Sequence, residues 1–355
     1  MKGLTLSREF CYEVVLPAIS TGVPGMEDRA ACGLLGMGSE CFAADDALSR
    51  DHHWGPRLSI LLTRADYAEV GDRLQTCVRQ KLPESYRGYG LESADACGYG
   101  VFVESIDAFF SRLCGHARPP EALRAWLDIA EEDLFKATTG EVFHDPVGEL
   151  TQRRAAFAYY PDPVWHKRLF DWTVLFSQWA NYNLLRIEKR GDVVAHRLYE
   201  GRCLQKLLEL SFLLNRRYAP DKKWLYWHFV RLPELAPEMI PKLERLVATS
   251  DRSEKYRLFG EMAGAVSDAM FERGLLKRRV ENVSHPEFGY RGLADAIPQL
   301  RTLVPSDWIT LPVNQASIWE GLYKDVVTFT LAEYLEMTGR GGTETTAADR
   351  SPERG

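Results

Sequence analysis

The sequence predicts an α+β protein in which a small mixed-sheet domain precedes an all-helical domain. Up to about residue 115, short apolar runs of strand length alternate with glycines, whereas from about residue 119 onward apolar residues recur with a helical period. The chain of 355 residues is also long enough for two domains of ordinary size. We therefore expect a sheet domain over residues 1–117, a helical domain over 118–338, and a disordered tail over 339–355, where apolar side chains are scarce.

The first domain is predicted to contain its elements in the order helix, strand, loop, strand, helix, strand, helix. Residues 6–19 have apolar side chains at helical spacing, with Ser7 as an N-cap. Residues 57–63 (RLSILLT) contain an apolar run that is typical of a buried strand. The remaining predicted elements are a short apolar strand at 31–37, a polar loop at 40–50, a helix at 66–81, a strand at 99–105 and a helix at 106–113.

The second domain is predicted to be helical throughout, because its apolar residues follow the 3.6-residue period and strand-like alternation is weak. Segment 142–146 contains an Asp-Pro turn signal and is expected to be a short loop between two helices. The expected helices span residues 121–129, 148–159, 163–190, 194–217, 223–231, 237–248, 253–273, 293–303 and 318–338.

Composition limits the classes of partner. Lys and Arg total 44 and Asp and Glu total 50, so the net charge of −6 lacks the positive surplus that sequence-independent nucleic-acid binding requires. No apolar run approaches the ~18 residues of a membrane span, and the N-terminus lacks the apolar core of a signal peptide. The seven cysteines are scattered without a Cys-x-x-Cys pair, which is typical of reduced thiols. We therefore expect a cytoplasmic protein that acts on small molecules, with no nucleic-acid or membrane partner.

The strongest chemical signal is a Gly-Ser turn followed by metal-ligating side chains. Gly38 and Ser39 follow one predicted strand, and Asp51 and His53 precede the next. Glycine lets the backbone approach a phosphate closely, and the backbone amides and the Ser39 hydroxyl can donate hydrogen bonds to it. Residues two apart on an extended chain point to the same side, so Asp51 and His53 can share one metal ion. A phosphate cradle facing metal ligands is what transfer of a group from a metal-bound nucleotide requires.

The run GMGSECFAADDALSRDHHWGPRLSILL (residues 36–62) resembles the DUF4037 family, a branch of the polymerase-β-type nucleotidyltransferase superfamily. The resemblance continues in TTGEVFHDPVGELTQRRAAFAYYPDPVW (residues 138–165) and in LLNRRYAPDKKW (residues 213–224). It implies a nucleotidyltransferase-like domain followed by a helical domain that closes a cleft against it. It also implies Mg-dependent transfer of a nucleotide to a small hydroxyl, amine or phosphate acceptor.

The resemblance assigns roles to individual residues. Gly38 and Ser39 would hold the β- and γ-phosphates of ATP or another nucleoside triphosphate, and Asp51 with His53 would hold Mg²⁺ or Mn²⁺. The family pattern usually has an Asp where this chain has His53. The superfamily's third carboxylate falls on Phe102 in our alignment, and Glu104, two residues further on, is the replacement that we expect. Because Mg²⁺ prefers carboxylates and water to imidazole, the expected site suits Mn²⁺ or Zn²⁺ better, or holds no metal.

Several basic residues are candidates for phosphate contacts. Arg50 and Arg57 flank the expected metal site, and their guanidinium groups suit phosphate; the alternative is a salt bridge to a nearby carboxylate. Lys223 leads the densest basic cluster of the helical domain and would clamp the triphosphate; the alternative is a solvated helix connection. The other members of this cluster are Arg216, Arg217 and Lys222.

Three interpretations of the site remain open from sequence. The protein is a nucleotidyltransferase with an altered metal site; or it is a catalytically degenerate or repurposed relative that binds a nucleotide or small molecule in a biosynthetic pathway; or Asp51 and His53 are structural. The expected ligands are a nucleotide and a small-molecule acceptor, and the sequence leaves the oligomeric state open.

Overall fold

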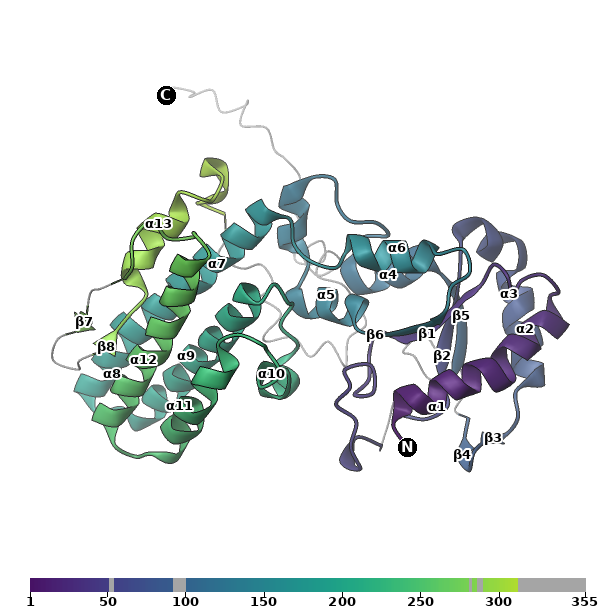
Figure 1. The fold of residues 1–355 in the computed structure, drawn as a ribbon, viewed down its shortest axis with the longest axis horizontal. Coiled ribbons are helices and arrows are strands. Elements are labelled where there is room, and N and C mark those ends of the chain that lie inside the picture. Colours follow the sequence, from purple (N-terminus) through teal and green to yellow (C-terminus); the bar gives the residue numbers. More distant parts are fainter. Residues whose placement is uncertain (51–53, 92–99, 281–282, 286–289, 312–355) are drawn as a thin grey trace, which may run out of the picture.

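The computed structural model of the chain describes residues 1–50, 54–91, 100–280, 283–285 and 290–311. It has the predicted α+β architecture, with a small mixed sheet and a larger helical part. The sheet and α1–α3 lie at one end of the molecule, the helical part lies at the other end, and α4–α6 lie between them (Figure 1). None of the helices in the described part of the chain has the length and apolar character that a membrane span requires.

The sheet has four strands in the order β5-β2-β1-β6. Strand β1 runs antiparallel to both of its neighbours, β2 and β6, whereas β2 and β5 are parallel. Three of the strands lie where the sequence predicted them, and the fourth, β6, does not. Their bounds are β1 (Ala31–Leu35), β2 (Leu58–Leu62), β5 (Val101–Ser105) and β6 (Gly140–His144).

Strand β6 corrects the prediction of a loop over 142–146. It comes from the segment assigned to the helical domain, so the sheet extends beyond the predicted boundary at residue 117. Glycines permit this pairing: a Cβ at Gly33 would approach the Glu141 carbonyl oxygen to 2.7 Å, and Gly140 has a φ of +81°. The sequence window could not show β6, because its hydrogen-bond partner lies about a hundred residues earlier in the chain.

The helices around the sheet agree with the predicted ones. α1 (Gly3–Phe10) continues through a π-helical turn into α2 (Leu16–Gly22), which covers the predicted helix at 6–19. α3 (Arg64–Lys81) follows β2, and its Gln75 side chain bonds the Val101 carbonyl and the Val103 amide. This contact satisfies backbone groups of β5, the strand at one edge of the sheet.

The helical part also follows the sequence pattern, with some differences. The predicted helix at 163–190 is α7, a π-helical segment and α8 in direct succession, and the predicted helix at 121–129 is a 3₁₀-helix. Helix α5 was not predicted. The predicted helix at 318–338 and the tail at 339–355 lie outside the described residues. The helices are α4 (Ile106–Cys114), α5 (Glu131–Thr138), α6 (Glu149–Ala156), α7 (Asp162–Ser177), α8 (Leu185–Arg190), α9 (Val193–Leu214), α10 (Lys222–Phe229), α11 (Ala236–Ala248), α12 (Arg252–Glu272) and α13 (Ile297–Arg301).

Among the described residues, two further pairs of short strands lie outside the main sheet. β3 (Ser85–Tyr86) pairs with β4 (Tyr89–Gly90), and β7 (Val283–His285) pairs with β8 (Tyr290–Arg291).

One hydrophobic core connects the sheet region with the helical region. Phe110 of α4 stacks on Phe157, just after α6, with ring centroids 5.1 Å apart, and Trp126 packs against the same ring. Buried apolar side chains continue from Leu6 in the first helix to Trp308 near the end of the described chain. Burial of this kind fixes the helices α4–α6 relative to the sheet, because separating them would expose large aromatic rings to water.

Candidate functional site

The Gly-Ser turn is half-buried and lies at one end of the central strands of the sheet. It follows β1 directly, and because β1 runs antiparallel to β2, the turn lies at the end of the sheet where β2 begins. Gly36 and Gly38 have φ values of +86° and +116°, which side chains rarely permit. The Ser39 carbonyl accepts a hydrogen bond of 2.8 Å from the Ala44 amide, which closes the turn. The glycines thus give the turn a backbone conformation that residues with side chains rarely adopt.

A buried ion pair between Arg57 and Glu40 packs against this turn. Arg57 Nε donates to Glu40 Oε1 at 2.8 Å, and Arg57 Nη2 donates to the Met37 carbonyl at 2.9 Å. Burial raises the pKa of Glu40, although the Arg57 guanidinium acts in the opposite direction. A Cβ at Gly38 would collide with the guanidinium of Arg57 and lie 2.9 Å from Glu40 Oε2. Arg57, which is 4% exposed, therefore forms the salt bridge that was the alternative to its predicted phosphate contact.

Glu104 lies away from the Gly-Ser turn. Its register partner in β2 is Leu61, which in turn faces Ala31 at the start of β1, whereas the turn follows the end of that strand. At about 3.3 Å per residue, the length of β1 separates the two positions by roughly 13 Å. Glu104 accepts a hydrogen bond of 2.7 Å from Arg112 of α4, and burial raises the pKa of this carboxyl. Its position does not bring it into a shared site with Gly38 and Ser39.

The remaining predicted site residues are Arg50 and Lys223, which the structure describes, and Asp51 and His53, which it does not. Arg50 is exposed, donates to the Met1 carbonyl at 3.1 Å and lies over the Trp54 ring at 4.4 Å. Lys223 is exposed in the first turn of α10, with its Nζ 5.1 Å from the centroid of the Trp224 ring. Asp51 and His53, the predicted metal ligands, lie outside the described residues. Their roles stay predictions.

A basic pocket lies between the loop after β1, helices α5 and α6, the end of α9, and α10 with the segments before and after it. Its volume is about 550 Å³, and its lining contains four arginines and one histidine. Asp and Glu are absent from the described residues that line it. The lining residues are Phe42, Ala43, Phe135, Thr138, Thr139, Arg154, Ala155, Ala158, Phe212, Arg216, Arg217, Tyr218, His228, Arg231 and Leu232.

The arginines of the basic pocket differ in what holds them. Arg154 donates to the carbonyls of Thr138, Thr139 and Gly140 at the C-terminal end of α5, with the shortest distance being 2.8 Å. Burial lowers the pKa of Arg154. Arg216 has a carboxylate partner, Asp162, at 2.8 Å.

The two remaining arginines lie near a half-buried histidine, His228. Burial, together with electrostatic repulsion from Arg231 and Arg217, lowers the pKa of His228 to about 4. Among the described residues, His228 Nε2 has no hydrogen-bond partner, and neither has Arg154 Nε, although both atoms are buried. Arg231 lies over the Trp227 ring at 4.1 Å. The pocket is therefore a region of concentrated positive charge that contains two buried nitrogen atoms without a hydrogen-bond partner among the described residues.

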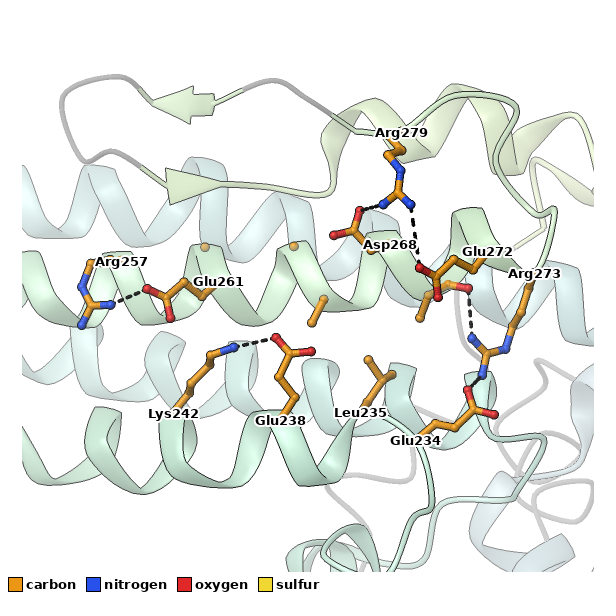
Figure 2. A pocket seen from close by; sticks show the side chains of 14 residues that line it. Glu234, Leu235, Glu238, Lys242, Arg257, Glu261, Asp268, Glu272, Arg273 and Arg279 are labelled. Atoms are coloured by element: carbon orange, nitrogen blue, oxygen red, sulfur yellow. Dashed lines mark hydrogen bonds and ion pairs between the residues drawn. The ribbon is translucent and has the colours of Figure 1, made fainter.

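A larger cavity, the charged groove between α11 and α12, has a different character. Its volume is about 850 Å³, and Figure 2 shows that its charged side chains point toward one another. Lys242 donates to Glu238 at 2.6 Å, and Arg279 to Asp268 at 2.8 Å. Arg257 pairs with Glu261, and Arg273 with Glu234. The charged side chains of the groove are therefore already paired with one another, within α11, within α12, or with the segments next to these helices.

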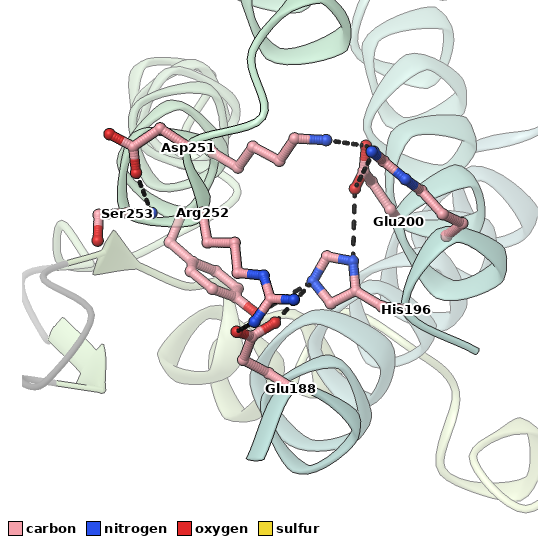
Figure 3. A network of polar contacts seen from close by, with 9 residues as sticks. Glu188, His196, Glu200, Asp251, Arg252 and Ser253 are labelled. Atoms are coloured by element: carbon pink, nitrogen blue, oxygen red, sulfur yellow. Dashed lines mark hydrogen bonds and ion pairs between the residues drawn. The ribbon is translucent and has the colours of Figure 1, made fainter. Parts of the chain in front are cut away.

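A third polar cluster joins α8, α9 and α12 (Figure 3). His196 lies between two carboxylates, with Nε2 3.3 Å from Glu188 and Nδ1 3.5 Å from Glu200. Lys255 donates to Glu200 at 2.7 Å, and Arg252 to Glu188 at 2.6 Å. Because every charge in this cluster is matched, we interpret it as a structural link between helices. The described residues include no group of three His, Cys, Asp or Glu side chains that could hold a metal ion.

Residues 126–225 match the model of one protein family. The family is described as Domain of unknown function (DUF4037). The match supports the resemblance to DUF4037 that the sequence predicted, and it covers 100 of the 355 residues. No curated protein matches the sequence. The DUF4037 segment begins at Trp126 and ends within α10. It contains ten of the fifteen residues that line the basic pocket, those from Phe135 to Tyr218.

Sequence reasoning found part of this pocket and missed the rest. Arg216 and Arg217 belonged to the predicted basic cluster, and Lys223, the member expected to act first, is not among the lining residues. Arg154, His228 and Arg231 were missed. Their approach depends on how α6 and α10 pack, and the sequence carries no periodic signal for contacts between helices so far apart.

Proposed function

We propose that this protein is a nucleotidyltransferase-like enzyme that transfers a nucleotide from ATP or another triphosphate to a small-molecule acceptor. The observation that carries the proposal is the Gly38–Ser39 turn, which lies at the end of an interior strand of a mixed sheet and begins the loop that contributes Phe42 and Ala43 to the basic pocket. The strand arrangement supports it too, since β1 and β2 are antiparallel and bring the turn toward the segment that precedes β2. The net charge of −6 favours a small acceptor over a nucleic acid.

In this proposal, the backbone amides of the turn and the Ser39 hydroxyl bind the β- and γ-phosphates. A hydroxyl or amine of the acceptor attacks the α-phosphorus, the bond to the bridging oxygen breaks, and pyrophosphate leaves. The chain's part is chiefly to position the two substrates and to stabilise negative charge, as in other phosphoryl-type transfers.

Asp51 and His53 would hold the divalent metal, which neutralises charge on the phosphate oxygens when it is bound. Glu104 is engaged by Arg112, so we leave it out of the proposed metal site. One carboxylate and one imidazole form a donor set that fits Mn²⁺ better than Mg²⁺.

A second candidate is a relative that binds the nucleotide or another small molecule without catalysis. The Glu104–Arg112 ion pair favours it, because this pair removes the third expected carboxylate from the site. Phe102, where our alignment expects the acidic residue, adds to the same argument. The two candidates differ in whether the metal contributes to nucleotide binding.

The test is the affinity for ATP with Mn²⁺, with Mg²⁺ and with EDTA, measured by calorimetry. We expect Asp51→Ala to weaken binding at least tenfold in Mn²⁺, and Asp72→Ala, on the exposed side of α3, to leave it unchanged. Equal binding of ATP in EDTA and in Mn²⁺, unaltered by Asp51→Ala, would contradict the transferase and favour the binding protein. If His53 is a ligand, His53→Asp should increase the Mg²⁺ affinity.

A further inference from the structure

We propose that the basic pocket binds the anionic group of the acceptor, a small molecule that carries a phosphate or carboxylate beside an apolar part. The name acceptor rests on the proposed function, whereas the anion site rests on the pocket alone. Both anions offer oxygen atoms that arginine side chains bind well, and arginine pairs with either one through two parallel hydrogen bonds.

Charge is the first argument. Four arginines and a histidine line about 550 Å³, and no carboxylate lines it among the described residues, in a chain whose net charge is −6. The neighbouring Arg217 and Arg231 repel protonation of His228. Such a cluster lowers the stability of the empty protein, so an anion that binds there gains the interaction that the chain itself does not supply.

Unsatisfied donors are the second, independent argument. Arg154 Nε and His228 Nε2 are buried and have no partner in the described part of the chain. Other polar groups of the lining are engaged: Thr138 donates to the Leu134 carbonyl at 2.6 Å, and Tyr218 donates to the Phe157 carbonyl at 2.9 Å. Buried polar atoms normally have partners, so the two free nitrogens indicate where a ligand oxygen would lie.

Shape and apolar surface limit the ligand. A volume of about 550 Å³ is within the range of small-molecule sites, roughly 300–1,000 Å³. The rings of Phe42 and Phe135 lie 5.2 Å apart on one wall, and Phe212 and Leu232 also line the cavity. The pocket therefore suits a compact molecule with an apolar or ring-shaped part.

Position relative to the turn identifies this molecule as the acceptor. Phe42 and Ala43 line the pocket only three and four residues after Ser39, and the Ala44 amide bonds the Ser39 carbonyl. The loop that begins with the turn therefore also forms part of the pocket wall. If the turn holds the phosphates of the nucleotide, the arginines of the adjacent pocket are available to the second substrate.

The test compares two double variants of the full-length chain. Arg154→Gln with Arg217→Gln removes pocket charge, and Arg257→Gln with Arg279→Gln removes the same charge from the charged groove. The probes are glucose 6-phosphate, citrate and glucose, and ATP with Mn²⁺, each measured by calorimetry. We expect saturable binding of glucose 6-phosphate or citrate but not of glucose, a loss of at least tenfold in the pocket variant, and no change in the groove variant. The anion that binds more tightly distinguishes a phosphate from a carboxylate ligand.

Several results would overturn the proposal. These are no saturable binding of either anion, wild-type affinity in the pocket variant, or an equal loss of ATP affinity, which would make the pocket the triphosphate site. Arg217 is exposed, so Arg217→Gln alone serves where the double variant does not fold, with an expected loss of about threefold. Anion binding that depends on the arginines, in a chain that does not bind ATP, would contradict the proposed function and support the anion site.

Discussion

The basic pocket and the charged groove each gather four arginine or lysine side chains, but their surroundings differ. In the groove, every one of these cations pairs with a carboxylate of α11 or α12 or of a flanking segment, as Figure 2 shows for Arg257 and Arg279. In the pocket, Asp162 pairs with Arg216, whereas Arg154, Arg217 and Arg231 have no carboxylate partner among the described residues.

This difference separates a role in folding from a role in binding. Paired charges at a helix interface contribute modestly to stability and offer little to a ligand, because their interactions are already made. Unpaired cations in a partly buried pocket cost stability, and selection retains such an arrangement where it serves function. The larger volume of the groove is therefore a weaker indication of a binding site than the charge of the pocket.

The largest expected effect on stability concerns Arg57, an arginine outside both cavities that is buried and paired with Glu40. Arg57→Met would leave the fully buried Glu40 carboxylate without its partner, which typically costs about 3–5 kcal/mol. We expect a large fall in the thermal unfolding temperature. Arg50→Met, on an exposed side chain, is the matched control and should have a small effect. A fall in Arg57→Met no greater than that of the control would show that pairing contributes little at this position.

The second prediction concerns pH and the basic pocket. The folded pKa of His228 is about 4, below its usual 6.5, so the unfolded chain takes up a proton first as the pH falls. This group therefore destabilises the empty protein between about pH 6.5 and pH 4. A bound anion offsets the repulsion from Arg217 and Arg231 and favours the protonated ring.

Sulfate, which does not titrate in this range, is the probe for that effect. If the bound pKa of His228 returns to its usual value, sulfate affinity should increase about tenfold from pH 7.5 to pH 5.5. His228→Gln should remove this pH dependence. An affinity that is equally pH-dependent in His228→Gln would assign the effect to another group.

The third prediction concerns the charged groove. Arg279→Gln breaks contacts with Asp268 at 2.8 Å and Glu272 at 3.8 Å, between side chains that are about half exposed. Exposed ion pairs contribute about 0.2–1 kcal/mol, so we expect a small loss of stability in urea unfolding and unchanged anion binding. Weaker anion binding in this variant would show that the charged groove also contributes to anion binding, which would contradict the proposed difference between the two cavities.

The smallest effect is expected for Arg217→Gln in the absence of ligand. This substitution removes a charge that repels its neighbours, so the stability of the empty protein should stay the same or increase by about 0.5 kcal/mol at most. Thermal unfolding at low salt, with Arg190→Gln as a surface control, measures the change. A clear loss of stability would mean that Arg217 has a structural partner, and it would weaken the case for a ligand.

The sequence determined most of the fold, because its strongest signals are local. The long helices α9, α11 and α12 follow from apolar periodicity, and β1, β2 and β5 follow from short apolar runs. Strand β6 was missed because the segment GEVFH has little apolar alternation and pairs with a strand about a hundred residues earlier. Its place in the sheet depends on Gly33 and Gly140, whose importance appears only when two backbones approach.

The candidate site shows the same division. Sequence alone identified the Gly38–Ser39 turn, because glycines after an apolar run and before a polar loop are a contiguous pattern. It assigned Arg57 to phosphate or to a salt bridge without deciding between them, and burial against Glu40 favoured the salt bridge. It also grouped Glu104 with Asp51 and His53 at the metal site, whereas strand register places Glu104 at the other end of the strands from the Gly38–Ser39 turn.

The basic pocket was decided by the tertiary structure. Its arginines come from α6, from the connection before α10 and from the residues just after α10, and only the two before α10 stood out in the sequence, as members of a basic cluster. Electrostatic interactions depend on distance in space and on burial, and neither is encoded in residue spacing across so many elements. The sequence therefore identified the Gly38–Ser39 turn that we propose as the phosphate site, and the packing of helices determined where positive charge gathers near it.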